Sequence, residues 1–255
     1  MRSQWGRSIT DRVVESLGQS IVGGDLAIAR VLRTDAALGQ HFCASRSVTR
    51  EAVKILSTKG LLITHSRQGT YVQPEEAWNL YDPDVLRWLL DRKFSLTLLR
   101  HVTEVRLAIE PAAAALAARR AAGDSLAAIL ASLERMYAAE RGQDELLAAD
   151  IAFHVSILKA SGNLFYIQLD ELVNTALRIS IRFTSSRKDR NHACVAAHRK
   201  VADAIVARDP GAASAAMTEV LTEVLDLIAR AQAEPSGGRG GVAMAAIEGL
   251  STAAA

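Results

Sequence analysis

Hydrophobic side chains recur every three or four residues along most of the chain, which predicts a mainly helical protein. The first such stretch spans residues 8–21, where Ile9, Val13, Leu17 and Ile21 lie four residues apart. The pair at 23–24 is Gly-Gly, which favours the end of a helix. We therefore expect an amphipathic helix that buries one apolar face near the start of the chain.

The pattern then predicts two further helices followed by a β-hairpin. A short helix is expected at 35–42, and a longer one at 46–59, after the N-cap Ser45 and before a glycine. Beyond this helix the hydrophobic pattern changes from helical to β-like, in two runs at 61–64 and 70–72 that are joined by a polar turn. Three helices and a hairpin in this order are typical of a winged helix-turn-helix.

After residue 74 the chain reads as an all-helical bundle. Pro111 interrupts the longest of these patterns and is expected to kink that helix or split it in two. The predicted helices span 84–90, 96–122, 125–141, 145–160, 165–184, 195–208 and 212–233. The predicted domains are a DNA-binding head (1–74), a connector (75–92), a ligand-binding and dimerisation bundle (93–234) and a flexible tail (235–255).

Composition agrees with helices and adds a charge asymmetry. The chain holds 45 alanines and only 5% aromatic residues, which favours helix over sheet. The net charge of +2 combines ten Lys or Arg against five Asp or Glu up to residue 74 with 20 against 23 afterwards. The basic head suggests a polyanionic partner. Two cysteines and no apolar run of membrane-spanning length predict a cytoplasmic protein without a disulfide framework.

Basic and hydroxyl side chains gather where a recognition helix would enter the major groove. Arg46 and Arg50 could read guanine, Lys54 suits a phosphate, and Ser45 and Ser47 offer hydroxyls. Arg67 and Gly69 would form the tip of the wing. A solvated basic helix is the alternative, but the order of the elements favours DNA binding.

The head resembles the GntR family of winged-helix regulators. The resemblance is carried by SRSVTREA at 45–52, GLL at 60–62 and GTYV at 69–72. It implies DNA contacts at Arg46, Ser47, Arg50 and the Gly69 wing. Where the family has a phosphate-binding arginine this chain has an aspartate, and Arg33, two positions earlier, is the candidate to replace it.

The helical half resembles the FadR-type effector (FCD) domain of that family. The matching runs are VRLAIEP at 105–111, ADIAFH at 149–154 and AHRKVADAI at 197–205. The connector WNLYDPDVLRW at 78–88 resembles that of galactonate-operon repressors and their sugar-acid-responsive relatives. The resemblance therefore implies a pocket for a small effector inside the bundle.

Three residues of the helical half are candidate metal ligands. Asp150 and His154 lie one helical turn apart and share a face, so they could hold a divalent metal such as zinc, or form a surface or capping pair. The resemblance adds His198 and places Val220 at the position of a fourth ligand. Valine cannot bind a metal, so the site has either three protein ligands or no metal.

Arginines of the same half are candidate effector ligands. The resemblance implies that Arg106 grips an effector carboxylate beside Asp150, His154 and His198, and Arg178 could assist. A buried pair between Arg106 and Glu110, one turn later, is the alternative reading.

The combined reading is a homodimeric, ligand-responsive transcription regulator rather than an enzyme. It predicts a repressor that binds a pseudo-palindromic operator and is released by a galactonate-like sugar acid, without an organic cofactor. One alternative is a response to lactate, a dicarboxylate or an amino acid through a metal-containing pocket. A metal-dependent hydrolase is the distant alternative, because no catalytic motif is present.

Overall fold

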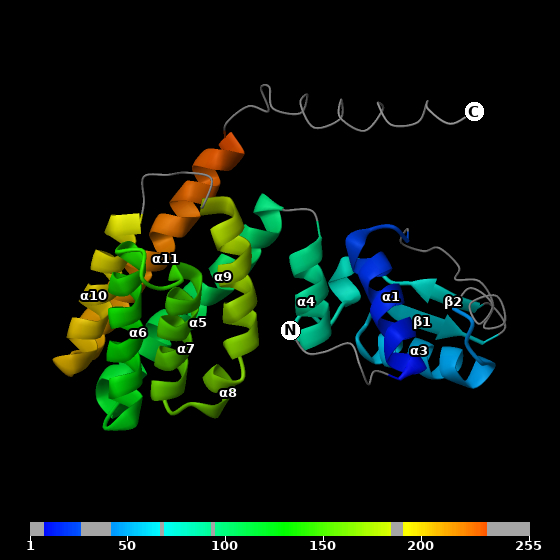
Figure 1. The fold of residues 1–255 in the computed structure, drawn as a ribbon, viewed down its shortest axis with the longest axis horizontal. Helices are drawn as coiled ribbons and strands as arrows, with labels where there is room; N and C mark the ends of the chain where they lie inside the picture. Colours follow the sequence, from blue (N-terminus) through cyan, green and yellow to red (C-terminus); the bar gives the residue numbers. More distant parts are fainter. Residues whose placement is uncertain (1–7, 27–41, 67–68, 93–94, 185–190, 234–255) are drawn as a thin grey trace.

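The computed structural model describes residues 8–26, 42–66, 69–92, 95–184 and 191–233. Figure 1 shows a small head at one end and a helical bundle at the other, with one helix between them. The described chain is mainly helical and contains a two-stranded antiparallel sheet. The predicted fold class, a winged head followed by an all-α bundle, is confirmed.

The head consists of α1 (Ile9–Gly23), α3 (Arg46–Thr58), β1 (Leu62–His65) and β2 (Gly69–Val72). Helix α1 begins with a capping box between Ser8 and Asp11 and ends at Gly24, whose φ of 88° is left-handed. The two strands form a hairpin in which Leu62 lies opposite Val72. The helix expected at 35–42 falls outside the described residues, which resume at residue 42.

The connector is a folded part of the head. A 3-10 turn (Glu75–Ala77) leads to α4 (Pro83–Asp91), which begins at the N-cap Asp82. Val85, Trp88 and Leu89 of α4 are buried in the same hydrophobic core as α1 and α3. The indole ring of Trp88 lies so close to Gly18 that a Cβ atom there would approach it to 2.2 Å. The head core is therefore complete only when α4 is packed against it.

Ion pairs also attach α4 to the head. The Nζ atom of Lys59, the C-cap of α3, lies 2.9 Å from Asp82 Oδ1 and 2.8 Å from Asp84 Oδ2. The Nη2 atom of Arg87 donates to Glu15 of α1 at 2.7 Å. Burial alone lowers the pKa of Lys59, but the two aspartates outweigh it and raise the pKa above its usual value. Helix α4 is thus tied both to α1 and to the end of α3.

The bundle consists of seven helices in the described chain, and α5 packs along α11 through its centre (Figure 1). They are α5 (Leu96–Arg120), α6 (Asp124–Glu140), α7 (Leu146–Ala160), α8 (Leu164–Ile167), α9 (Asp170–Thr184), α10 (Asn191–Val206) and α11 (Pro210–Ala233). Alanines 113, 114, 117 and 118 are fully buried, and their small side chains allow close helix packing. Helix α9 also contacts α4, which joins the bundle to the head.

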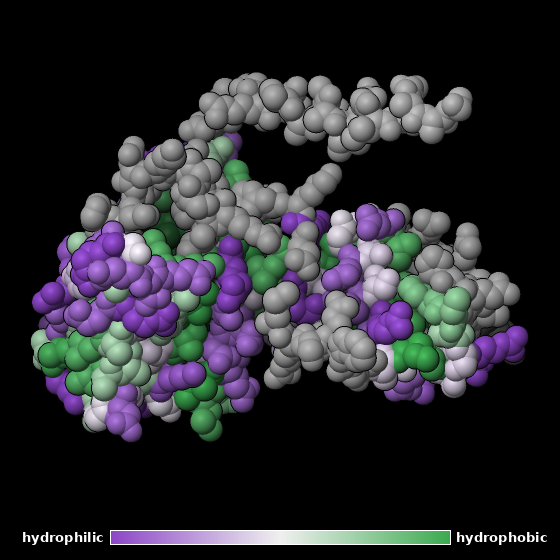
Figure 2. All heavy atoms as spheres, viewed as in Figure 1, coloured by the Kyte–Doolittle hydropathy of each residue, from purple (hydrophilic) through white to green (hydrophobic). Residues whose placement is uncertain are grey.

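The visible face of the molecule carries both polar and apolar side chains. Figure 2 shows hydrophilic side chains over most of the visible face, with smaller hydrophobic patches between them. In the part of the chain that the structure describes, no helix combines the length and apolar character needed to cross a membrane.

The structure decides one alternative at Pro111 and corrects one predicted helix. Helix α5 continues through Pro111 as one element, so the proline does not split it. Proline removes only one backbone hydrogen bond, and the buried side chains on either side hold the helix in the bundle. The helix expected at 165–184 is instead two helices, because the chain turns at residues 168–169 between α8 and α9.

Candidate functional site

The first candidate site is the exposed side of α3. Ser45 caps this helix, because its side chain accepts a hydrogen bond from the backbone N–H of Val48 at 3.4 Å. Its hydroxyl also lies 2.9 Å from the hydroxyl of Ser47. The cap fixes the start of the helix, so that both serines lie together at its N-terminus.

The two faces of α3 differ as a recognition helix requires. Arg46, Ser47, Arg50 and Lys54 are exposed. The side chain of Lys54 is 76% exposed and forms a long ion pair with Glu51, at 3.8 Å. The opposite face is buried against the head by Thr49, Ala52, Val53 and Leu56. The predicted basic and hydroxyl side chains therefore share the accessible face of the helix.

The wing is described in part. Gly69 is the first residue of β2 and pairs with His65. Its φ is 108°, a backbone conformation that would be strained in a residue with a side chain. Arg67 at the predicted tip of the wing, and Arg33 of the predicted second helix, lie outside the described residues.

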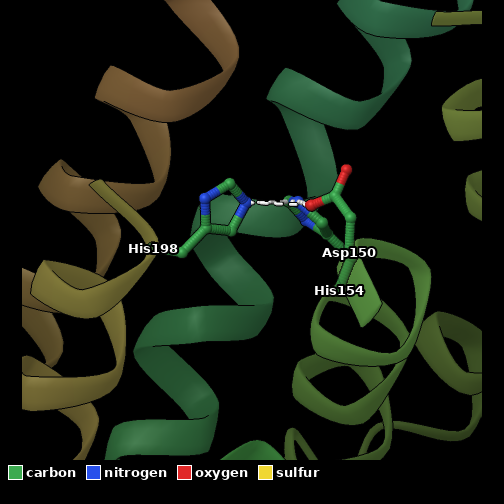
Figure 3. A group of neighbouring side chains, drawn as sticks. All are labelled: Asp150, His154 and His198. Atoms are coloured by element: carbon green, nitrogen blue, oxygen red, sulfur yellow. Dashed lines mark hydrogen bonds and ion pairs between the residues drawn. The ribbon is translucent and has the colours of Figure 1, made fainter. Parts of the chain in front are cut away.

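The second candidate site lies inside the bundle, where Asp150 and His154 of α7 meet His198 of α10 (Figure 3). The Nε2 atoms of the two imidazoles are 3.1 Å apart. Asp150 Oδ1 lies 3.1 Å from His198 Nε2 and 3.4 Å from His154 Nε2. Three potential ligand atoms from two helices thus converge on one point.

The chemistry of these atoms fits a divalent cation. Asp150 Oδ1 is buried and accepts no hydrogen bond, despite its short distances to the two rings. Burial by itself raises the pKa of Asp150, but the imidazoles of His154 and His198 outweigh it and hold the pKa below its usual range. An ionised carboxylate beside two imidazole nitrogens is a donor set that zinc prefers. The aromatic ring of Phe153 packs edge-on against both imidazoles.

A second acidic group lies on the other side of the His154 ring. The Nδ1 atom of His154 is 2.5 Å from Oε2 of Glu110 on α5. The other oxygen of Glu110 accepts from Arg106 Nε at 2.6 Å. Burial alone raises the pKa of Glu110, but Arg106 and His154 outweigh it and lower the pKa to about 2. Glu110 is therefore a buried carboxylate that contacts both Arg106 and His154.

The predicted effector ligands are placed differently from one another. Arg106 is 2% exposed and forms the pair with Glu110, and its Nη2 also lies 3.3 Å from His154 Nδ1. Arg178 is exposed on α9 and donates to Asn174 at 2.9 Å, outside this buried cluster. Val220 is a buried residue of α11 and offers no ligand atom. The structure therefore brings Arg106, Asp150, His154 and His198 together, but not Arg178.

Glu110 is the member of this cluster that the sequence prediction treated only as a partner of Arg106. The signal was its spacing of four residues from Arg106 in an otherwise apolar run. Its contact with His154 joins residues 44 positions apart, which only the packing of α5 against α7 creates.

The comparisons with known proteins match both parts of the chain. The model of the bacterial regulatory proteins of the gntR family matches residues 9–72, and the FCD domain model matches 101–223. The galactonate operon transcriptional repressor of Escherichia coli is 33% identical over 83% of this chain and 93% of that protein. The transcriptional regulator LutR of Bacillus subtilis is 30% identical over 82% and 95%. The Listeria monocytogenes protein Lar shares the fold with a TM-score of 0.56, at 16% identity over 88% of this chain and 98% of Lar.

Proposed function

The chain belongs to the gntR family of bacterial regulatory proteins and carries an FCD domain, and from this premise we propose that it is a homodimeric repressor of sugar-acid catabolism. As a member of this family it is a DNA-binding transcription regulator rather than an enzyme, so the hydrolase alternative is set aside. A galactonate-like carboxylate would release it from its operator. The 33% identity to a galactonate operon repressor supports this choice of effector.

The observation that carries the proposal is the buried polar cluster in the middle of the FCD region. Arg106, Glu110, Asp150, His154 and His198 lie in contact inside a helical bundle whose core is largely apolar. Buried charges of this kind are costly unless they serve binding or are fully paired. Arg106 supplies the planar pair of donors that a carboxylate ligand requires. The cluster therefore suits a small, hydroxylated carboxylate.

Asp150, His154 and His198 would hold a divalent cation, zinc being the best match for one carboxylate and two imidazoles. When bound, the cation would act as a Lewis acid toward carboxylate and hydroxyl oxygens of the effector. Without it, the cluster carries two carboxylates against one arginine when both histidines are neutral. A cation removes this excess negative charge, which favours an anionic ligand.

On the DNA side, the exposed face of α3 would enter the major groove. Arg46 and Arg50 would contact bases, and Lys54 and the hydroxyls of Ser45 and Ser47 would contact phosphates. Two such heads in a homodimer would read the two halves of a pseudo-palindromic operator. Effector binding would favour an arrangement of the heads that does not match the operator spacing.

The proposal is tested with a DNA duplex selected by the protein from a randomised pool. Binding of this duplex is followed by fluorescence anisotropy while galactonate, gluconate, lactate, malate and glycine are added in turn. Galactonate or gluconate should release wild-type protein, and Arg106→Met should abolish the release. Arg100→Met is the matched control, because Arg100 forms an exposed pair with Glu104 on the same helix. Release by lactate, malate or glycine alone would replace the sugar acid with that ligand class, and unchanged release in Arg106→Met would remove Arg106 from the effector site.

Elemental analysis of the purified protein tests the cation separately. One zinc per chain is expected in wild type, and much less in Asp150→Ala or His198→Ala. A zinc-free wild-type protein that also takes up no added zinc would refute the metal centre without affecting the DNA-binding assignment.

A further inference from the structure

Glu110 occupies an unusual place between the two functional parts of the buried cluster. One of its carboxylate oxygens accepts from Nε of Arg106 at 2.6 Å, and the other lies 2.5 Å from Nδ1 of His154. Both partners are 2% exposed and Glu110 is 1% exposed. One buried side chain of α5 is thus in contact with the candidate effector ligand and with a candidate metal ligand.

The contact favours one tautomer of the His154 ring. Arginine only donates hydrogen bonds, so the carboxylate of Glu110 that it holds is the ionised acceptor. Nδ1 of His154 lies 2.5 Å from this acceptor and 3.3 Å from Nη2 of Arg106, and the nearer acceptor favours the tautomer with the hydrogen on Nδ1. A neutral imidazole has one N–H, which leaves a lone pair on Nε2. Nε2 is the ring atom that faces Asp150 and His198.

We propose that Glu110 is a positioning residue for the cation site, because it holds His154 in the tautomer and orientation in which Nε2 can bind a metal. A carboxylate behind a metal-binding histidine is a general way of orienting the ring and raising its basicity. Glu110 itself lies behind the ring and is not one of the converging ligands. The inference rests on the proposed cation site but concerns a residue that is not part of it.

The shared carboxylate also connects the two ligands of the protein. Arg106 and His154 bind the same side chain, so an effector that draws Arg106 away would change the hydrogen bonding behind His154. Conversely, a cation bound at His154 Nε2 would keep Glu110 engaged at Nδ1. Affinity for zinc and affinity for the effector should therefore depend on each other, by equal factors in both directions.

The first test measures zinc affinity by competition with a chelating dye. Glu110→Gln should weaken zinc binding about 10–100-fold, because the amide has no charge and its NH2 group can donate to Nδ1, which would place the hydrogen on Nε2. Glu104→Gln is the matched control, since Glu104 lies on the same helix, is 52% exposed and pairs with Arg100. Its zinc affinity should equal that of wild type. A purely structural role for Glu110 predicts a lower melting temperature in zinc-free protein without a change in zinc affinity.

The second test reads the tautomer directly in zinc-free wild-type protein by 15N NMR of labelled histidines, with His154→Gln to assign the signal. The hydrogen is expected on Nδ1. A hydrogen on Nε2 would overturn the inference, and so would wild-type zinc affinity in folded Glu110→Gln. This measurement decides the question even if Glu110→Gln fails to fold. Absence of zinc binding to wild type would refute the cation site together with the role of Glu110 in it, whereas zinc binding with the hydrogen on Nε2 in zinc-free protein would overturn the inference alone.

Discussion

Replacing Arg106 by methionine is the sharpest test of the buried cluster. Methionine matches the aliphatic part of the arginine side chain, but it removes the guanidinium group and its charge. Glu110 would remain 1% exposed and would lose the donor 2.6 Å from its Oε1 atom. Arg106→Met should therefore destabilise the bundle, because an ionised carboxylate is left without its main partner.

Two lines of reasoning give the size of this effect. Removing one partner of a buried ion pair commonly costs about 3–5 kcal/mol. The lowering of the pKa of Glu110 from 4.5 to about 2 corresponds to about 3 kcal/mol of stabilisation at neutral pH. Burial opposes that lowering and His154 contributes to it, so the second figure is the net effect of burial and both partners rather than the share of Arg106 alone. We expect a loss of about 3 kcal/mol in the free energy of unfolding.

The positions of the tryptophans allow the two parts to be followed separately. The chain has 3 tryptophans, at positions 5, 78 and 88, and none in the bundle. Urea unfolding followed by circular dichroism at 222 nm reports mainly the bundle, and tryptophan fluorescence reports the head and connector. Arg106→Met should move the first transition to lower urea concentration.

The control is Arg100→Met, six residues earlier on α5. Arg100 and Glu104 have the same residue types and spacing as the buried pair, but they are 48% and 52% exposed. Their separation should cost less than about 1 kcal/mol. Equal losses in the two variants, or a loss below about 1 kcal/mol in Arg106→Met, would refute the assignment of a buried charge pair.

Three further changes test the head. Arg50→Ala should weaken binding of the selected duplex by about 1–3 kcal/mol if this arginine reads a base, and anisotropy titrations that show unchanged affinity would contradict the recognition-helix assignment. Gly18→Ala should cost about 1–3 kcal/mol by overpacking, because its Cβ would approach the ring of Trp88 to 2.2 Å; a fluorescence-detected midpoint equal to wild type would show that the contact is not tight. Lys59→Met should lower the free energy of unfolding by about 1–3 kcal/mol in the same assay. The control Lys54→Met, at a position 76% exposed, should change it by less than about 0.5 kcal/mol. Similar effects of the two substitutions would argue against the ion cluster at the end of α3.

The local patterns of the chain were sufficient for most of the fold. The four-residue recurrence of apolar side chains, the Ser45 cap and the glycines at helix ends predicted α1, α3 and the hairpin close to their observed bounds. These features act within a few residues, which is why they can be read directly. The local pattern left a kink or a split open at Pro111, and only packing across the bundle decided that α5 continues as one helix.

The candidate residues of the buried site could also be named from the sequence, but their relationships could not. The residues at 150 and 154 are one turn apart on any helix, and their common face follows from helix geometry alone. The approach of His198 to 3.1 Å from Asp150 depends on how α10 packs against the rest of the bundle. The same holds for Arg178, which helix packing leaves exposed and bonded to Asn174.

By itself, the sequence determined the helical class, the basic head with its exposed basic and hydroxyl side chains, and a set of polar residues in the helical half. Only the tertiary structure decided that Glu110 lies between Arg106 and His154, and that α4 is held to the head by Lys59 and Trp88. The physical reason is the range of the forces involved. Helix periodicity and capping are set by neighbours in the chain, whereas a buried hydrogen bond depends on side chains that long-range packing brings together.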